Sequence, residues 1–126
     1  MIIAIIDHSD ALYEKAIKIM VQLGKEKASL VTTEFILLEV VNALSKQPFR
    51  DCVISYINGL KKLKNVRIFQ ANIEFFHKGW SLYCDRKYKD WSLTDCISFE
   101  VMINQGITKS FTSDHHFEQA GFVKLM

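Results

Sequence analysis

Three acidic side chains, Glu39, Asp95 and Asp114, stand out because each lies in an apolar setting or at the expected start of a helix. Asp95 closes the run 90–95, and Asp114 follows the apolar segment 107–112. Clustered carboxylates are the ligands that Mg²⁺ and Mn²⁺ prefer in proteins, and distant positions can supply them to one site. The pattern favours a metal-dependent hydrolase.

Each acid also has a purely structural interpretation. Asp95 ends a capping-box sequence, and Asp114 can cap a short final helix. Glu39 can pair with Lys46 on the surface of its own helix. Asp90 is either a fourth acid of the site or an exposed loop charge, and the second interpretation is slightly favoured. The agreement of three acids, more than any one of them, supports a metal site. If they converge, at least one should have a raised pKa in the absence of metal.

Apolar periodicity predicts strands that alternate with helices from end to end. Strands are expected at residues 1–6, 29–33, 66–69, 107–112 and 122–125. Helices are expected at about 10–24, 34–46, 50–62, 73–88, 93–105 and 114–119. This alternation implies an α/β fold with a mainly parallel sheet covered on both faces. Functional polar residues are then expected at the carboxyl ends of the strands.

The helix expected at 34–46 is apolar nearly all the way round, which predicts that most of its sides are buried. Glu39, Asn42 and Lys46 form a narrow polar stripe along it. Because a buried carboxylate must be paired or bound to a cation, Glu39 is either half of a surface ion pair or a metal ligand. The adjacent His115 and His116 cannot form a metal-binding pair spaced by one helical turn, so a surface role is expected for both.

Composition limits the remaining possibilities. A chain of 126 residues with 49% hydrophobic residues is expected to be a single domain, residues 1–126, with a packed core. Its net charge of +2 shows no extended basic coat, so any contact with nucleic acid must be local. Three cysteines without paired spacing favour a reducing compartment. The opening apolar run is too short to cross a membrane, and a cytoplasmic protein is expected.

Three segments together resemble the PIN domain family, of the VapC-like kind. They are Thr33-Glu-Phe-Ile-Leu-Leu-Glu39-Val-Val-Asn42, Asp90-Trp-Ser-Leu-Thr-Asp95-Cys-Ile-Ser-Phe99, and Phe111-Thr-Ser-Asp114-His-His-Phe-Glu-Gln-Ala-Gly-Phe122. The resemblance implies a three-layer α/β/α sandwich with a mainly parallel central sheet. It also implies a Mg²⁺- or Mn²⁺-dependent endoribonuclease, commonly a toxin held by a cognate antitoxin and often a homodimer.

The resemblance assigns roles by position. Glu39, Asp95 and Asp114 match the family's catalytic and metal-binding acids. Asn42 and Thr112 match supporting polar residues, and Asp90 matches less closely. In the implied mechanism, carboxylates hold one or two divalent ions that assist hydrolysis of an RNA phosphodiester.

The start of the chain departs from the family pattern. Members open with a strand that ends in an Asp, followed by an apolar helix start and then an Ala. Aligning that Ala with Ala4 places the strand and its Asp before Met1, so residues 1–6 become the helix start, against their periodicity. Asp7 and Asp10 then fall beyond that helix start. This alignment predicts a PIN-like domain that lacks the first strand and first acid, with an unpaired edge in its sheet.

Two classes of function therefore stay open. The first is the endoribonuclease toxin. The alternative is a catalytically impaired PIN-like protein that binds RNA or an antitoxin without turnover, which the loss of the first acid favours. A nucleotide-binding α/β protein is a third reading, but the sequence has no phosphate-binding loop. Titration with Mn²⁺ distinguishes the first two.

Overall fold

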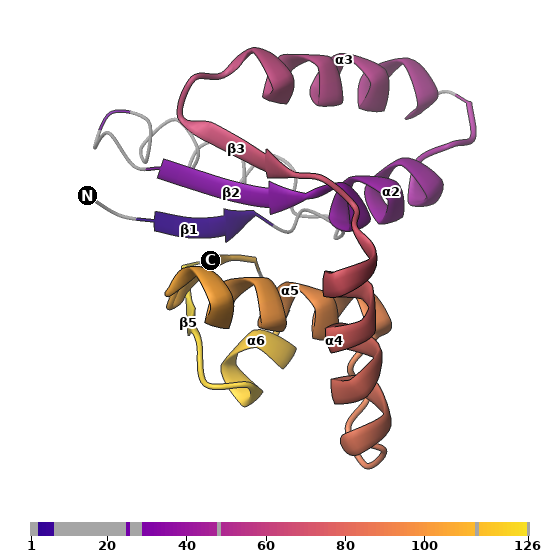
Figure 1. The fold of residues 1–126 in the computed structure, drawn as a ribbon. Coiled ribbons are helices and arrows are strands. Elements are labelled where there is room, and N and C mark those ends of the chain that lie inside the picture. Colours follow the sequence, from indigo (N-terminus) through magenta and orange to yellow (C-terminus); the bar gives the residue numbers. More distant parts are fainter. Residues whose placement is uncertain (1–2, 7–24, 26–28, 48, 113, 126) are drawn as a thin grey trace.

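The computed structural model describes residues 3–6, 25, 29–47, 49–112 and 114–125. Within these residues, five parallel strands form one sheet in the order β3-β2-β1-β4-β5 (Figure 1). The strands are β1 (Ile3–Ile6), β2 (Ser29–Thr33), β3 (Val66–Phe69), β4 (Lys109–Phe111) and β5 (Val123–Lys124). The helices are α2 (Glu34–Ala43), α3 (Phe49–Lys62), α4 (Ile73–Asp85), α5 (Leu93–Gln105) and α6 (His116–Gln119). The predicted α/β fold with a parallel sheet is confirmed.

β1 contradicts the prediction that residues 1–6 begin a helix after a lost strand. Ile3–Ile6 pair in parallel with β2 on one side and with β4 on the other, so β1 lies at the centre of the sheet. An unbroken apolar run is typical of a central parallel strand, because helices cover both faces of such a sheet. Because β1 is paired on both sides, the unpaired edge predicted beside a missing strand is not found in the described sheet.

The position of β1 also removes the basis for placing the family's first acid before Met1. In the sequence, Asp7 directly follows Ile6, the last residue of this strand. That is where the family pattern has its first acid. Asp7 and Asp10 themselves, and the helix predicted at 10–24, lie outside the described residues.

The other predicted elements are confirmed, with shorter ends. β2 and β3 have the predicted bounds, whereas α2 ends at Ala43 instead of about residue 46 and α4 at Asp85 instead of about 88. The strand predicted at 107–112 is reduced to Lys109–Phe111. Periodicity places an element but does not fix its last turn, where capping and fraying decide the boundary. None of the described helices is long and apolar enough to cross a membrane.

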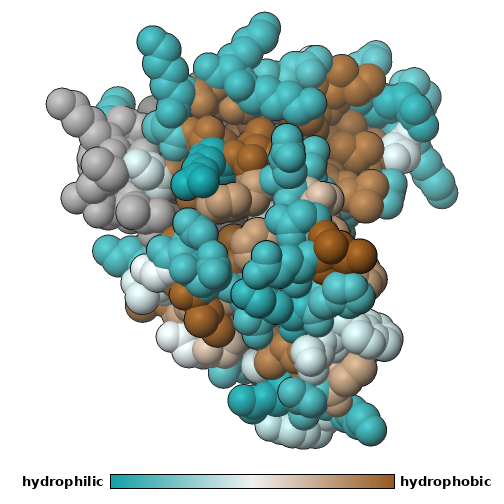
Figure 2. Space-filling view, viewed as in Figure 1, coloured by the Kyte–Doolittle hydropathy of each residue, from teal (hydrophilic) through white to brown (hydrophobic). Residues whose placement is uncertain are grey.

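The prediction that α2 is buried on most of its sides is wrong. Ile36 and Val40 are buried, but Leu38 is 59% exposed and Val41 is also exposed. Figure 2 shows hydrophobic side chains gathered at the upper right of this face, over α2 and α3. Apolar residues on all sides of a helix predict that the helix is buried. They do not specify whether the same chain or a partner protein buries it.

The helices α4, α5 and α6 are packed more closely. α4 and α5 lie side by side below β1, β2 and β3 in Figure 1. Gly79 of α4 is buried against α5, where an added Cβ would lie 3.0 Å from both Cα and N of Ile97. Further along α5, the ring of Phe99 packs edge to face on Trp91 and Phe117, with centroids 5.0 and 4.9 Å apart. This aromatic cluster joins α5 to α6.

Candidate functional site

Asp95 is placed by the start of α5. Ser92 caps the helix, and its Oγ accepts a hydrogen bond of 3.0 Å from the Asp95 N–H. Asp95 Oδ2 in turn accepts one of 3.2 Å from the Ser92 N–H, which completes the predicted capping box. Because α5 ends at Gly106 just before β4 begins, it runs back against the strand direction. Its first turn therefore lies at the carboxyl edge of the sheet, where α/β folds place their sites.

Asp114 is placed by the turn between β4 and α6. Its N–H donates to Oγ1 of the buried Thr112 at 3.0 Å, and its Oδ1 accepts from the His116 N–H at 2.9 Å. Asp114 is not the predicted cap of α6: His115 is the N-cap residue, no side chain caps the helix, and the Asp114 bond closes a turn just before it. Phe117, which is fully buried, anchors the far side of the turn in the aromatic cluster.

His116 brings the two acids together. Its Nδ1 lies 3.1 Å from Asp95 Oδ2 and 3.3 Å from Asp114 Oδ1. An ionised carboxylate can only accept hydrogen bonds, so hydrogen bonds to Nδ1 require the form of His116 that carries a proton on this nitrogen. The prediction of a surface role is wrong for His116, whose side chain is only 19% exposed, whereas His115 is exposed. Its place two residues after Asp114, inside the same turn, signals a contact with Asp114, but nothing in the sequence marks its approach to Asp95.

Burial raises the pKa of the Asp95 carboxyl above its ordinary value, and the charge of Asp114 raises it further. The Ser92 N–H and the His116 side chain act in the opposite direction. The net effect is upward, because desolvation of the charged form outweighs the hydrogen bonds that favour it. Asp95 has the raised pKa that was expected of at least one acid, although burial, and not repulsion between carboxylates, is its main cause.

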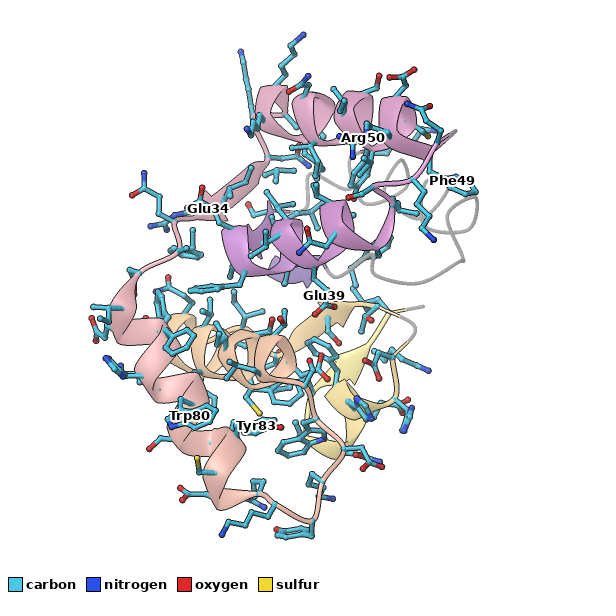
Figure 3. The ribbon with its side chains drawn as sticks, turned by 90° about the vertical axis from the view of Figure 1, so that its right-hand side faces the viewer. Glu34, Glu39, Phe49, Arg50, Trp80 and Tyr83 are labelled. Atoms are coloured by element: carbon cyan, nitrogen blue, oxygen red, sulfur yellow. The ribbon has the colours of Figure 1, made fainter. Side chains whose placement is uncertain are left out.

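Among the described residues, Glu39, Asn42 and Asp90 form no hydrogen bond or ion pair with Asp95 or Asp114. Glu39 is half-buried on α2, and Figure 3 shows its side chain pointing away from α3, toward the half of the molecule that contains α5. In the part of the chain that the structure describes, it forms no ion pair with Lys46. Asn42 is exposed, and Asp90 is exposed in the loop before α5. The convergence of Glu39 with the other acids stays a prediction.

The donor set around His116 fits a divalent cation. Besides one backbone N–H each, the two carboxylates share a single side-chain nitrogen, and Asp95 is nearly buried, so their negative charge is not fully compensated. Ligand atoms of Asp114, His115 and His116 all lie within 4.8 Å of one another. Carboxylate oxygens are hard ligands that suit Mg²⁺ or Mn²⁺, and an imidazole nitrogen is compatible with Mn²⁺.

Comparison with known proteins gives a family and a fold. The chain matches the sequence model of the PIN domain family over residues 1–123. No curated protein matches it. Among solved structures it is similar to the crystal structure of Mycobacterium tuberculosis VapC20, a sarcin-ricin loop cleaving toxin. The TM-score is 0.78 at 19% sequence identity, and 96% of each chain is covered. At this identity the likeness establishes the fold.

Proposed function

The chain belongs to the PIN domain family, and we propose that it is an endoribonuclease toxin that hydrolyses RNA phosphodiesters with a divalent metal ion. The observation that carries the proposal is the meeting of Asp95 and Asp114 around His116 at the carboxyl edge of a parallel sheet. The similarity in fold to an RNA-cleaving toxin supports the choice of substrate.

Asp95 and Asp114, together with Glu39, are the proposed ligands of Mg²⁺ or Mn²⁺ and the catalytic acids. When bound, such an ion supplies Lewis-acid stabilisation of the charge that builds up on the phosphate oxygens. Thr112 fixes the turn that presents Asp114, and His116 holds both carboxylates in place. Asn42, which is exposed on α2, is a candidate supporting residue. Asp90 is left out of the site, because it is an exposed loop charge.

The alternative of a catalytically impaired binding protein loses its main support. It rested on a missing first strand and first acid, whereas β1 is a described central strand and Asp7 directly follows it in the sequence. We propose that Asp7 supplies the family's first acid. An Asp7→Asn variant that cleaves RNA as fast as the wild type would contradict this assignment.

The exposed apolar surface over α2 and α3 supports a protein partner. Leu38 of α2 and Phe49 and Ile54 of α3 are each more than half exposed, and Figure 2 shows hydrophobic side chains gathered over these two helices. We propose that a cognate antitoxin or a second copy of the chain covers this surface, and that the pair acts in the cytoplasm. The homodimer is tested by sedimentation of the purified protein across a range of concentrations.

The cleavage proposal is tested with a fluorescent single-stranded RNA in Mn²⁺, with added EDTA as the metal-free control. Asp95→Asn and Asp114→Asn should each slow cleavage by about 100-fold or more, because each removes a charged ligand. Asp51→Asn, a charge change of the same kind at an exposed residue of α3, should cleave normally. Circular dichroism must show that the variants fold. Wild-type cleavage rates in Asp114→Asn would overturn the proposal, and so would an unchanged melting temperature of the wild type on addition of Mn²⁺.

A further inference from the structure

A pocket of about 810 Å³ lies between the C-terminal part of α4 and the loop that leads into α5, and it extends to the first residues of that helix. Trp80 and Tyr83 line it from α4, and Ser92 lines it at the cap of α5. Ser92 also exchanges hydrogen bonds with Asp95 in the capping box. A strand of RNA that reaches the acids can therefore reach this pocket as well.

Trp80 and Tyr83 form a stacked pair on the surface of α4. Their ring centroids are 5.6 Å apart at an interplanar angle of 16°, and the two residues are 50% and 44% exposed. Figure 3 shows the two labelled side chains close together along the lower half of this helix. Ring faces left open to solvent in this way are the surfaces on which unpaired nucleobases stack, whatever their sequence.

Cations surround the stacked rings. Arg86, Lys87 and Lys89 line the same pocket, whereas Asp90 is the one acid that lines it. Across the described ranges, these three cations make no ion pair with a carboxylate, and Arg86 donates instead to the Tyr88 hydroxyl at 2.9 Å. The lining thus keeps a net positive charge, which is complementary to the phosphates of a nucleic acid.

The frame of the pocket is fixed by packing. Trp91 is 7% exposed, and its Nε1–H donates to Gln119 Oε1 at 3.1 Å. Its ring also packs on Phe99 in the aromatic cluster. On the other wall, the close approach of Gly79 to Ile97 holds α4 against α5. A pocket held in this way is formed before its ligand arrives, which lowers the entropic cost of binding.

We propose that this pocket binds an unpaired base of the RNA strand, stacked on the rings of Trp80 and Tyr83, with the flanking phosphates held by Lys87 and Lys89. This inference rests on the proposed function, since it adds a recognition subsite beside the cleavage site. Duplex RNA does not offer a free base face, because its bases are already paired and stacked. The pocket therefore selects single-stranded RNA.

The test measures binding in EDTA, where metal-dependent cleavage is stopped, by the anisotropy of a labelled single-stranded oligoribonucleotide. Trp80→Ala should raise the dissociation constant about tenfold, and Trp80→Phe should recover most of that loss. Phe76→Ala is the matched control, because Phe76 is an exposed aromatic residue of the same helix outside the pocket. A duplex of the same sequence should bind more weakly and be unaffected by Trp80→Ala.

The binding of phosphates by the two lysines is tested by salt dependence. Substituting Lys87 and Lys89 together by Ala should lower the slope of log affinity against log salt by roughly 0.7 for each phosphate that the variant no longer neutralises. The matched control substitutes Lys61 and Lys62 of α3 and should leave the slope unchanged. An equal fall in slope for both pairs would overturn the assignment of the phosphates to this pocket.

Two outcomes overturn the base-binding proposal. One is that Trp80→Ala binds single-stranded RNA as tightly as the wild type. The other is that Trp80→Ala converts a dimer into a monomer in sedimentation, which would make this face an interface between copies of the chain. If substitution of Asp114 slows cleavage but substitution of Trp80 leaves RNA binding unchanged, only the pocket inference fails. If substitution of Trp80 weakens RNA binding but substitution of Asp114 leaves cleavage unchanged, only the nuclease proposal fails.

Discussion

The two groups of helices, α2 with α3 and α4 with α5 and α6, which are called layers below, hold their candidate site acids in different ways. In the layer of α4, α5 and α6, Asp95 and Asp114 are each fixed by backbone hydrogen bonds and by His116. In the layer of α2 and α3, Glu39 has no ion pair among the described residues, and the apolar surface around it is partly open. Local hydrogen bonds hold Asp95 and Asp114 in position before any ligand binds. The layer of α2 and α3 instead has an apolar face that a partner can cover.

The largest expected contrast comes from one phenylalanine in each layer. Phe117→Ala empties a fully buried site in the aromatic cluster and should lower the free energy of unfolding by about 3–5 kcal/mol. Phe49→Ala on α3 removes a ring that is 56% exposed. This variant should change the free energy of unfolding by less than about 0.5 kcal/mol. Urea denaturation measures both values. Similar losses for the two variants would contradict the contrast between the layers.

Glycines provide a second matched pair. Gly79→Ala places a Cβ against the backbone of Ile97 and should destabilise the protein by about 1–3 kcal/mol, because α4 must move away from α5. Gly59→Ala on α3 meets nothing within 4 Å and should stabilise that helix by up to about 1 kcal/mol. Opposite signs in thermal melting are therefore expected. A neutral Gly79→Ala would show that the two helices can separate without cost.

The sequence predicted best what short-range bonding decides. The capping box from Ser92 to Asp95 was visible as residue types at a fixed spacing. The aromatic residue three positions after Asp114 could likewise be seen as part of a motif. Such features depend only on neighbours in the chain, so one sequence is enough to predict them.

The errors have identifiable physical causes. Residues 1–6 were assigned correctly by periodicity and wrongly by an alignment on a single Ala, which carries much less information than an unbroken apolar run. The role of His116 depends on its approach to Asp95, 21 residues earlier, and no local pattern encodes that distance. The exposure of Leu38 depends on what covers α2, which the spacing of apolar residues cannot specify.

The raised pKa of Asp95 gives the layer of α5 a pH dependence in the absence of metal. The folded state binds a proton on the Asp95 carboxyl more tightly than the unfolded state, in which the pKa of this carboxyl is near 3.8. The free energy of unfolding should therefore fall as the pH rises from about 4 through the raised pKa, and then stay at its lower value. Asp95→Asn lacks this fall and should melt higher than the wild type at pH 7 without metal, whereas Mn²⁺ should raise only the wild-type melting temperature.

Asp114→Asn serves as the control for the cause of this shift. Burial contributes more than the Asp114 charge, so this variant should keep most of the decrease in stability with pH. Complete loss of the decrease in Asp114→Asn would mean that repulsion between the carboxylates, and not burial, dominates. Thermal melting in EDTA across the acidic and neutral range distinguishes the two causes.

The smallest effect on folding is expected from Leu38→Ser on α2, and it tests whether the open face is a partner surface. Because Leu38 is already 59% exposed, the free energy of unfolding should change by less than about 0.5 kcal/mol. If a second copy covers this side chain, the dissociation constant of the dimer should rise about tenfold, since the variant buries less apolar area on association. Ile103→Ser, on a 65% exposed residue of α5, is the matched control and should leave association unchanged. Equal effects of the two variants in sedimentation would show that exposure alone does not mark the α2 surface as the interface.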